Sequence, residues 1–303
     1  MRQIALVAPL CGALAGCASL SPSRLQTDSE RAPESLTGVV SQLKMHMRDD
    51  TYRYDRAVAT DGRNVYAVAL WKLDRLAGLR GKPEAEWENA DYVVEFARGK
   101  ALERLRRYGE ALAAFQRVGA SGSLLGDSAS ERARVMESFA LAAAPPDEPF
   151  ANPDEERTFI DGKIGLWRRL AEEVQGTPHE PLAREEIEAW QVMRVDWLAR
   201  ADRLADATFS CEKLIESNRD SKLYGKHLLR LGDLYAASAR RASLQARANL
   251  ANLDPAHYET LLDQAFSAYE LAAEDRRPAL RREARNRIEA LLAYHDGAAA
   301  RVP

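Results

Sequence analysis

The five histidines of this 303-residue chain are scattered singly along the sequence. A metal site needs histidine, cysteine or carboxylate ligands at short spacing. His179 is followed by Glu180 and Pro181, so the paired histidines of a zinc protease helix are absent. The other histidines also stand alone: His46, His227, His257 and His295. The sequence therefore predicts no metal site and no cofactor.

Catalytic nucleophiles are equally isolated. A nucleophile needs a base and a group that orients the base. No Gly-x-Ser-x-Gly sequence and no glycine-rich phosphate loop occurs, and residues 121–123 are typical of a turn. Cys211 falls at a helical packing position, which favours a buried, unreactive thiol. We predict that the chain is not an enzyme and that it has no small-molecule substrate.

Two carboxylate clusters could serve a glycan-cleaving enzyme, namely residues 154–156 and the pair Glu185-Glu186. Both are expected in the first turns of helices, where negative charge complements the helix dipole. The structural interpretation is preferred. A peptidoglycan-acting enzyme, or its helical accessory domain, stays open as an alternative function. It requires Glu185 to lie partly buried beside a sugar-sized cleft.

The clearest chemical signal lies at the amino terminus. Residues 4–14 match the apolar region of a secretory leader and are too short for the roughly 20 residues of a membrane-spanning helix. They run into Leu14-Ala15-Gly16-Cys17, which resembles the lipobox of bacterial lipoproteins. The resemblance implies cleavage after Gly16 and acylation of Cys17. A plain secretory leader is the alternative, and it would end in an Ala-x-Ala site.

The resemblance to Gram-negative lipoproteins also implies a location. No aspartate follows Cys17, which by their sorting rules favours the outer membrane, with the body facing the periplasm. Two or more acyl chains anchor a protein stably, whereas one chain is marginal. After removal of the leader with Cys11, only Cys211 remains as a free thiol.

Composition sets the class of the remaining chain. Hydrophobic residues make up 46% and charged residues 29%, as in globular proteins. The formal net charge of −3 argues against a dedicated nucleic-acid binder, which is usually strongly basic. Helix formers dominate, and no stretch alternates β-branched residues. An all-α fold is expected.

Two stretches carry residues at the spacing of tetratricopeptide repeats. The first has Gly99, Leu102, Tyr108, Ala111 and Phe115, and the second has Leu231, Gly232, Tyr235, Ala265 and Tyr269. This resemblance implies stacked helical hairpins, an α-solenoid, in which Gly99 crosses Ala111 and Gly232 crosses Ala265. The second unit holds about 20 residues more than the repeat period permits, so it needs longer helices or an insert. Residues 197–217 match the pattern poorly, and an irregular helical bundle is the alternative.

Local signals divide the chain further. We expect a leader at 1–16, a lipidated cysteine and flexible tether at 17–35, helical hairpins at 36–144, a proline-rich break at 145–153, hairpins at 154–297 and a tail at 298–303. Helix starts are expected at Asp61, Ser128, Asn152-Pro153 and Asp254-Pro255, and a helix end at Gly297.

These features favour a membrane-anchored, non-catalytic scaffold or adaptor that binds a periplasmic or outer-membrane protein. The chain broadly resembles small repeat-bearing lipoproteins of outer-membrane protein assembly, which implies a role in envelope assembly. A structural spacer between envelope layers is a further alternative. The predicted partner groove, on the first helices of the hairpins, is formed by Tyr92, Glu95, Lys100, Glu103, Lys226, Arg230 and Asp233.

A basic cluster near the carboxyl terminus is the last candidate site. It consists of Arg276, Arg277, Arg281, Arg282, Arg285 and Arg287. Because acidic residues are interleaved, the simpler interpretation is a solvated helix face. The alternative is a docking patch for an acidic partner or an anionic envelope surface.

Overall fold

The computed structural model describes residues 32–49, 52–55, 58–59, 62–77, 91–248 and 254–299. Within these residues the chain forms eleven helices and no strand beyond one isolated bridge, Val58 to Asn64. The predicted leader (1–16), the lipidation site Cys17 and residues 18–31 lie outside this part of the chain. The helices are α2 (Ala32–Asp49), α3 (Val65–Ala77), α4 (Asp91–Arg104), α5 (Tyr108–Gly119), α6 (Gly126–Ala143), α7 (Pro153–Glu173), α8 (Glu180–Arg200), α9 (Leu204–Ser217), α10 (Tyr224–Ala248), α11 (Pro255–Ala273) and α12 (Pro278–Ala299).

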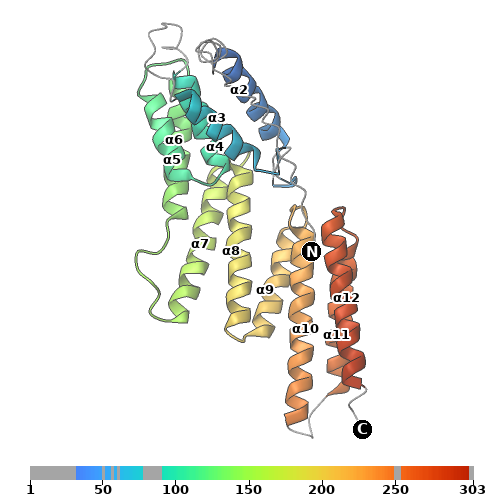
Figure 1. The fold of residues 1–303 in the computed structure, drawn as a ribbon. Helices are drawn as coiled ribbons and strands as arrows, with labels where there is room; N and C mark the ends of the chain where they lie inside the picture. The colour runs from blue at the N-terminus through green and yellow to red at the C-terminus, as the bar shows by residue number, and fades with distance from the viewer. Residues whose placement is uncertain are drawn as a thin grey trace, which may run out of the picture.

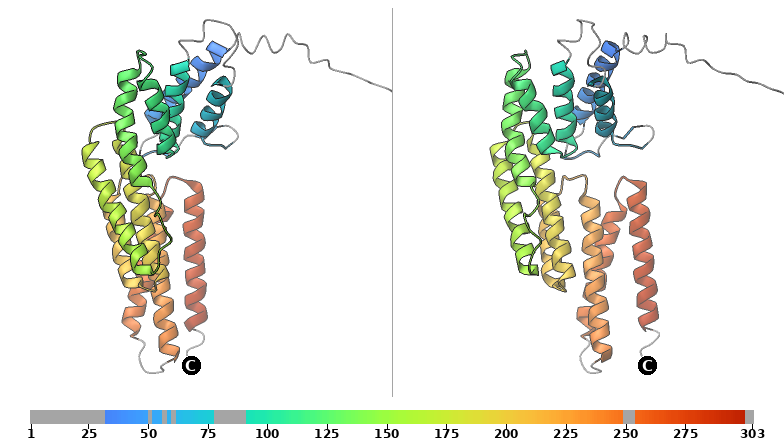
Figure 2. Two further views of the ribbon diagram at one scale, coloured as in Figure 1. Left: turned by 90° about the vertical axis from the view of Figure 1, so that its left-hand side faces the viewer. Right: turned by 60° about the vertical axis from the view of Figure 1, so that its left-hand side comes forward.

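Consecutive helices lie side by side as helical hairpins, and each contacts the helix before and after it (Figure 1). The stack is elongated, with α2–α6 at one end, α7–α9 in the middle and α10–α12 at the other end (Figures 1 and 2). None of the described helices combines the length and hydropathy that crossing a bilayer requires. The predicted all-α fold of stacked hairpins is confirmed.

Some predicted helix boundaries match the structure and others do not. Asn152 and Asp254 cap α7 and α11, because their side-chain oxygens accept backbone N–H bonds from the first turn. The start of α3 is capped by Asn64, which accepts a bond from the N–H of Tyr66 at 2.8 Å. The predicted cap Asp61 lies outside the described residues. Ser128 was predicted to start a helix and Gly297 to end one, but Ser128 lies inside α6 and Gly297 lies inside α12.

The turn between α4 and α5 has the same geometry as the turn between α8 and α9. Arg106 and Asp202 occupy matching positions in it, with φ of 60° and 61°. In each turn the next residue, Arg107 or Arg203, donates its N–H to a carbonyl five residues earlier, at 3.0 and 2.9 Å. Residues 197–217, which match the repeat pattern poorly, therefore belong to a hairpin of the same kind as α4–α5.

Two glycines allow close contact within their hairpins. A Cβ added to Gly99 would lie 2.6 Å from the ring of Phe115, and one added to Gly232 would overlap the ring of Tyr269. The other predicted packing residues that are buried are Leu102, Tyr108, Ala111 and Ala265, whereas Leu231 and Tyr235 are only half-buried. The α10–α11 hairpin accommodates its extra residues by helix length, since α10 alone has 25 residues.

The hydrophobic core continues across the proline-rich segment at 145–153. Phe139 of α6 packs edge-on against Trp167 of α7 and against Tyr108 of α5, with ring centroids 4.9 and 5.4 Å apart. Lys163 of α7 donates to the carbonyl oxygens of Ala142 and Ala144, at 2.7 and 2.6 Å, and so satisfies the end of α6. The break therefore ends a helix without separating two cores.

A short segment between α2 and α3 reaches the middle of the stack. Tyr52 is 2% exposed, and its carbonyl accepts a bond from the N–H of Lys222 at 3.2 Å. The guanidinium of Arg184 lies 4.4 Å from the centre of its ring. Arg53 forms an ion pair with Asp220 at 3.1 Å. The amino-terminal helices are thereby joined to the turn between α9 and α10.

Candidate functional site

Of the four predicted groove residues of α4, Glu95 and Glu103 are buried. Glu95 is 5% exposed and forms ion pairs with Arg98, at 3.0 Å, and with Arg117. Although burial alone raises the pKa of Glu95, hydrogen bonds from the two arginines bring that pKa below its usual value. Tyr92 and Lys100 are half-buried, with the ammonium of Lys100 over the ring of Phe96. Glu95 therefore joins helices and does not face a partner.

Glu103, also predicted to line the groove, is 1% exposed. Its carboxylate accepts a bond from Arg132 of α6 at 2.8 Å, and Nε2 of His179 lies 3.7 Å away. Burial raises the pKa of Glu103, but His179 and the charge of Arg132 outweigh burial and lower it below its usual value. The prediction was wrong here, because a buried carboxylate with these partners joins α4, α6 and the α7–α8 turn.

The carboxylates Glu185 and Glu186 were expected in a first helical turn, yet they lie in the second turn of α8 and are buried. Glu185 pairs with Arg106 at 3.0 Å and with Lys222 at 2.6 Å. Tyr108 donates to Glu186 at 2.8 Å. Glu185 lines neither of the two grooves described below.

The three remaining groove residues, Lys226, Arg230 and Asp233, do come together. They lie on one face of α10 and line a groove of about 730 Å³ between α8 and α12, here named the α8–α12 groove. Its lining comprises Val195, Asp196 and Ala199 of α8, Leu204 of α9, Lys226, Leu229, Arg230, Asp233, Leu234 and Ala237 of α10, and Glu283 and Arg287 of α12.

Ion pairs across the α8–α12 groove fix its walls. Arg230 binds Asp196 of α8 at 2.9 Å. Arg287 of α12 binds Asp233 of α10, and it binds Glu283 of its own helix at 2.8 Å. Asp233 also accepts a hydrogen bond from Tyr269. With these charges paired, the groove presents an apolar floor between balanced polar walls, as in many protein interfaces.

The predicted basic patch divides into two groups. Arg277 and Arg287 are engaged within the fold, Arg277 with Asp275 and with the carbonyl of Lys222, so these two do not form a solvated face. The exposed members are Arg276, Arg281, Arg282 and Arg285.

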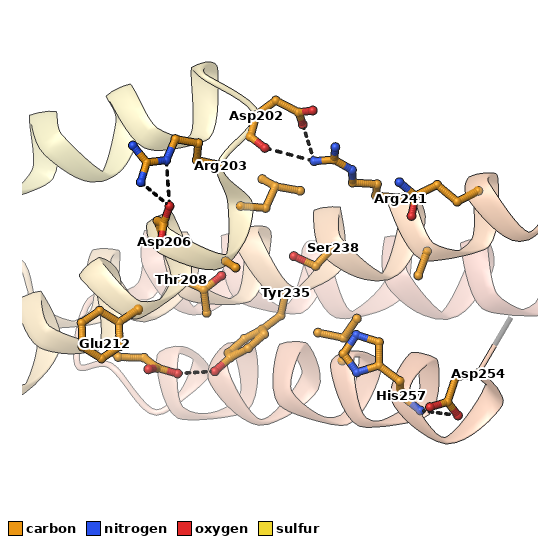
Figure 3. Close-up of a pocket in the computed structure, with 16 residues that line it drawn as sticks. Asp202, Arg203, Asp206, Thr208, Glu212, Tyr235, Ser238, Arg241, Asp254 and His257 are labelled. Atoms are coloured by element: carbon orange, nitrogen blue, oxygen red, sulfur yellow. Dashed lines mark hydrogen bonds and ion pairs between the residues drawn. The ribbon is translucent and has the colours of Figure 1, made fainter. Parts of the chain in front are cut away.

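A second groove, not predicted from the sequence, lies on another face of α10 between α9 and α11 (Figure 3). It encloses about 690 Å³ and is named the α9–α11 groove. Tyr235, predicted to pack beside Gly232, instead lines this groove, and its hydroxyl donates to Glu212 of α9 at 2.5 Å. The sequence signal for this groove was the long separation between Gly232 and Ala265. This separation requires long helices, which extend beyond α9.

Reactive groups in the described part of the chain are either buried or scattered. Burial raises the pKa of Cys211 to about 12, and the thiol points toward the carbonyl of His227 at 3.7 Å. His227 itself is buried and bound to Glu188 at 2.7 Å. No group of three or more histidine, cysteine or carboxylate side chains that could hold a metal ion occurs among the described residues.

Comparisons with known proteins add little to this geometry. No family model and no curated protein matches the sequence. Among solved structures, a TPR repeats protein from Bacteroides fragilis matches at 17% identity and a TM-score of 0.30, covering 86% of this chain and 98% of its own. From its own helices and turns, the chain is an all-α stack of tetratricopeptide-like hairpins.

Proposed function

We propose that this chain is a non-catalytic scaffold or adaptor that holds a segment of a protein partner in the α8–α12 groove. The observation that carries the proposal is the meeting of Lys226, Arg230 and Asp233 with walls from α8 and α12. Stacked helical hairpins commonly bind proteins along such surfaces. The paired wall charges orient a partner, and the apolar floor supplies affinity.

Lys226 indicates where an acidic residue of the partner segment would bind. Its side chain is exposed at the edge of the groove, whereas Arg230 and Arg287 are already bound to carboxylates. A partner carboxylate at this edge could therefore pair with Lys226, because no carboxylate of the groove is paired with it. The favoured partner segment carries apolar side chains for the floor and an acidic residue beside Lys226.

The groove is tested by photo-crosslinking in cells. A benzophenone amino acid in place of Ala199, which lines the groove from α8, is expected to give a discrete protein adduct, and the same residue at exposed Lys213 of α9 should not. Ala237→Trp fills the groove and should abolish the adduct, whereas Ala293→Trp on the exposed face of α12 should leave it. An adduct that persists unchanged in Ala237→Trp would contradict the proposal.

We propose further that the chain is anchored by lipid on Cys17 to the outer membrane and faces the periplasm, with a role in envelope assembly. The lipobox-like residues 14–17 and the absence of aspartate after Cys17 support this. Mass spectrometry of the mature protein should find residue 17 at the amino terminus carrying diacylglycerol and an amide-linked acyl chain. Cys17→Ser should lose the acyl mass and the membrane fractionation. A mature chain that starts elsewhere, or lacks fatty acid, would overturn the anchor and leave the groove proposal intact.

A further inference from the structure

The α9–α11 groove has the shape and charge of a second docking surface. Its apolar lining consists of Leu204 and Ala205 of α9, Ala242 of α10 and Leu261 of α11, together with Phe209 of α9, which is 60% exposed. Exposed apolar surface of this kind, rimmed by polar groups, marks interaction sites.

The dimensions fit a helix. Along α10 the lining extends from Tyr235 to Gln245, about 15 Å at the rise of an α-helix, or roughly three turns. The groove is walled by helices, whose backbone groups are bonded internally, so it has no strand edge to pair with an extended peptide. Ala205 and Ala242, which face the groove from two helices, leave room for close approach of a third helix.

The rim is acidic. Four carboxylates and two arginines line the groove, which leaves a net charge of −2 with His257 neutral. Both arginines are already bound, Arg203 to Asp206 and Arg241 to Asp202, each at 2.6 Å.

The other two rim acids are Glu212, which accepts a bond from the neutral hydroxyl of Tyr235, and Asp254, which caps α11. No cation of the groove lining balances these two carboxylates. Such a rim repels phosphate-bearing lipids and nucleic acids and attracts cationic groups.

We propose that the α9–α11 groove docks a cationic amphipathic helix of a protein partner, with its apolar face on Ala242 and its basic flanks beside Glu212 and Asp254. This surface goes beyond the proposed function, because it uses another face of α10 and different charges. A chain with both grooves occupied would bridge two protein partners.

The test uses the mature chain in a nonionic detergent and three labelled 14-residue peptides, measured by fluorescence anisotropy. The first peptide places leucines on one helical face and lysines elsewhere, the second replaces each lysine with glutamate, and the third scrambles the first. Only the first peptide is expected to bind well, with the other two at least about tenfold weaker. Equal binding of the lysine and glutamate peptides would overturn the proposal.

Two variants locate the binding. Ala242→Trp should weaken the lysine peptide at least about tenfold, whereas Ala237→Trp, which fills the α8–α12 groove, should leave it unchanged. Glu212→Gln, which keeps a hydrogen-bond acceptor for Tyr235, should weaken binding and reduce its salt dependence. Wild-type binding by both Ala242→Trp and Glu212→Gln would place the peptide elsewhere. The Ala237→Trp variant distinguishes the two proposals, because it alters only the α8–α12 groove.

Discussion

The hydroxyl of Tyr52 donates a hydrogen bond to the side-chain oxygen of Asn218 at 2.5 Å, across 166 residues of sequence. The amide nitrogen of Asn218 in turn donates to Gln191 at 3.0 Å and to the carbonyl of Leu214 at 2.7 Å. The side chain of Asn218 is thus bonded through both its oxygen and its nitrogen. This arrangement joins the segment before α3 to α8 and to the end of α9.

Replacing Tyr52 with phenylalanine should lower the free energy of unfolding by about 1–3 kcal/mol, because the buried oxygen of Asn218 loses its donor. Urea titration followed by circular dichroism measures the change. Tyr54→Phe is the matched control, since Tyr54 is 62% exposed, and it should stay within about 0.5 kcal/mol of the wild type. Equal effects of the two substitutions would show that the Tyr52 bond adds no stability.

Alanine at Gly99 or Gly232 should destabilise the fold by about 1–3 kcal/mol, because the new methyl group would overlap the ring of Phe115 or Tyr269. A methyl group added to Gly165 of α7 would meet no atom within 4 Å outside its own helix turn, so Gly165→Ala should stabilise the helix by about 0.5–1 kcal/mol. Thermal unfolding of the three variants distinguishes these opposite signs. A stabilising Gly99→Ala would mean that the hairpin opens easily at this crossing.

The repeat pattern identifies the two hairpins in which a glycine faces an aromatic ring, but it matches the α8–α9 hairpin poorly. Aligning the two identical turns places Val195 at the position of Gly99, and Cys211 at the position of Phe115. The large and small members of the pair are exchanged, and both Val195 and Cys211 are buried in one core cluster. Packing tolerates such exchanges when volume is kept. A pattern that requires glycine first therefore overlooks this hairpin.

His227→Ala should lower the free energy of unfolding by about 1–3 kcal/mol or more, because Glu188 would be left buried without its partner. His227 and Glu188 are each 1% exposed, so water cannot replace the bond easily. His257→Ala, at an exposed position of α11, is the control and should have little effect. Denaturant titration of both variants gives the comparison, and a neutral His227→Ala would contradict this role.

Acid should weaken the fold partly through Glu103. Its pKa is lower in the folded state than its ordinary value of 4.5, so its contribution is complete above that value and is lost as the pH falls through the folded pKa. Glu103→Gln should be less stable than the wild type at neutral pH, and the difference should shrink as the pH falls from about 5 to about 3. Urea titration across this range measures the difference. A constant difference would mean that Glu103 is not ionised in the fold.

Cys211 should be inert toward thiol reagents in the native protein. Burial raises its pKa to about 12, so the thiolate is scarce at pH 8, and the side chain is 0% exposed. A chromogenic disulfide should react with this free thiol only after urea is added. Rapid reaction in buffer alone would show that the helices around Cys211 open readily.

Three of the seven predicted groove residues lie together as helix periodicity indicates, and two others are buried. Lys226, Arg230 and Asp233 share one face of α10, which spacing alone indicates. Glu95 and Glu103 of α4 are buried instead, and they bind Arg117 of α5 and Arg132 of α6. Arg132, the partner of Glu103, lies 29 residues further along the chain, and periodicity within one helix carries no information about such partners.

The contact between Tyr52 and Asn218 also sets an order of events during synthesis. Asn218 leaves the ribosome 166 residues after Tyr52, which takes roughly 10–30 s at ordinary rates of translation. Until then the segment that carries Tyr52 has no surface to close on. A nascent chain that is interrupted before the α9–α10 turn would therefore present this tyrosine to proteases and chaperones, and complete translation removes it from their reach.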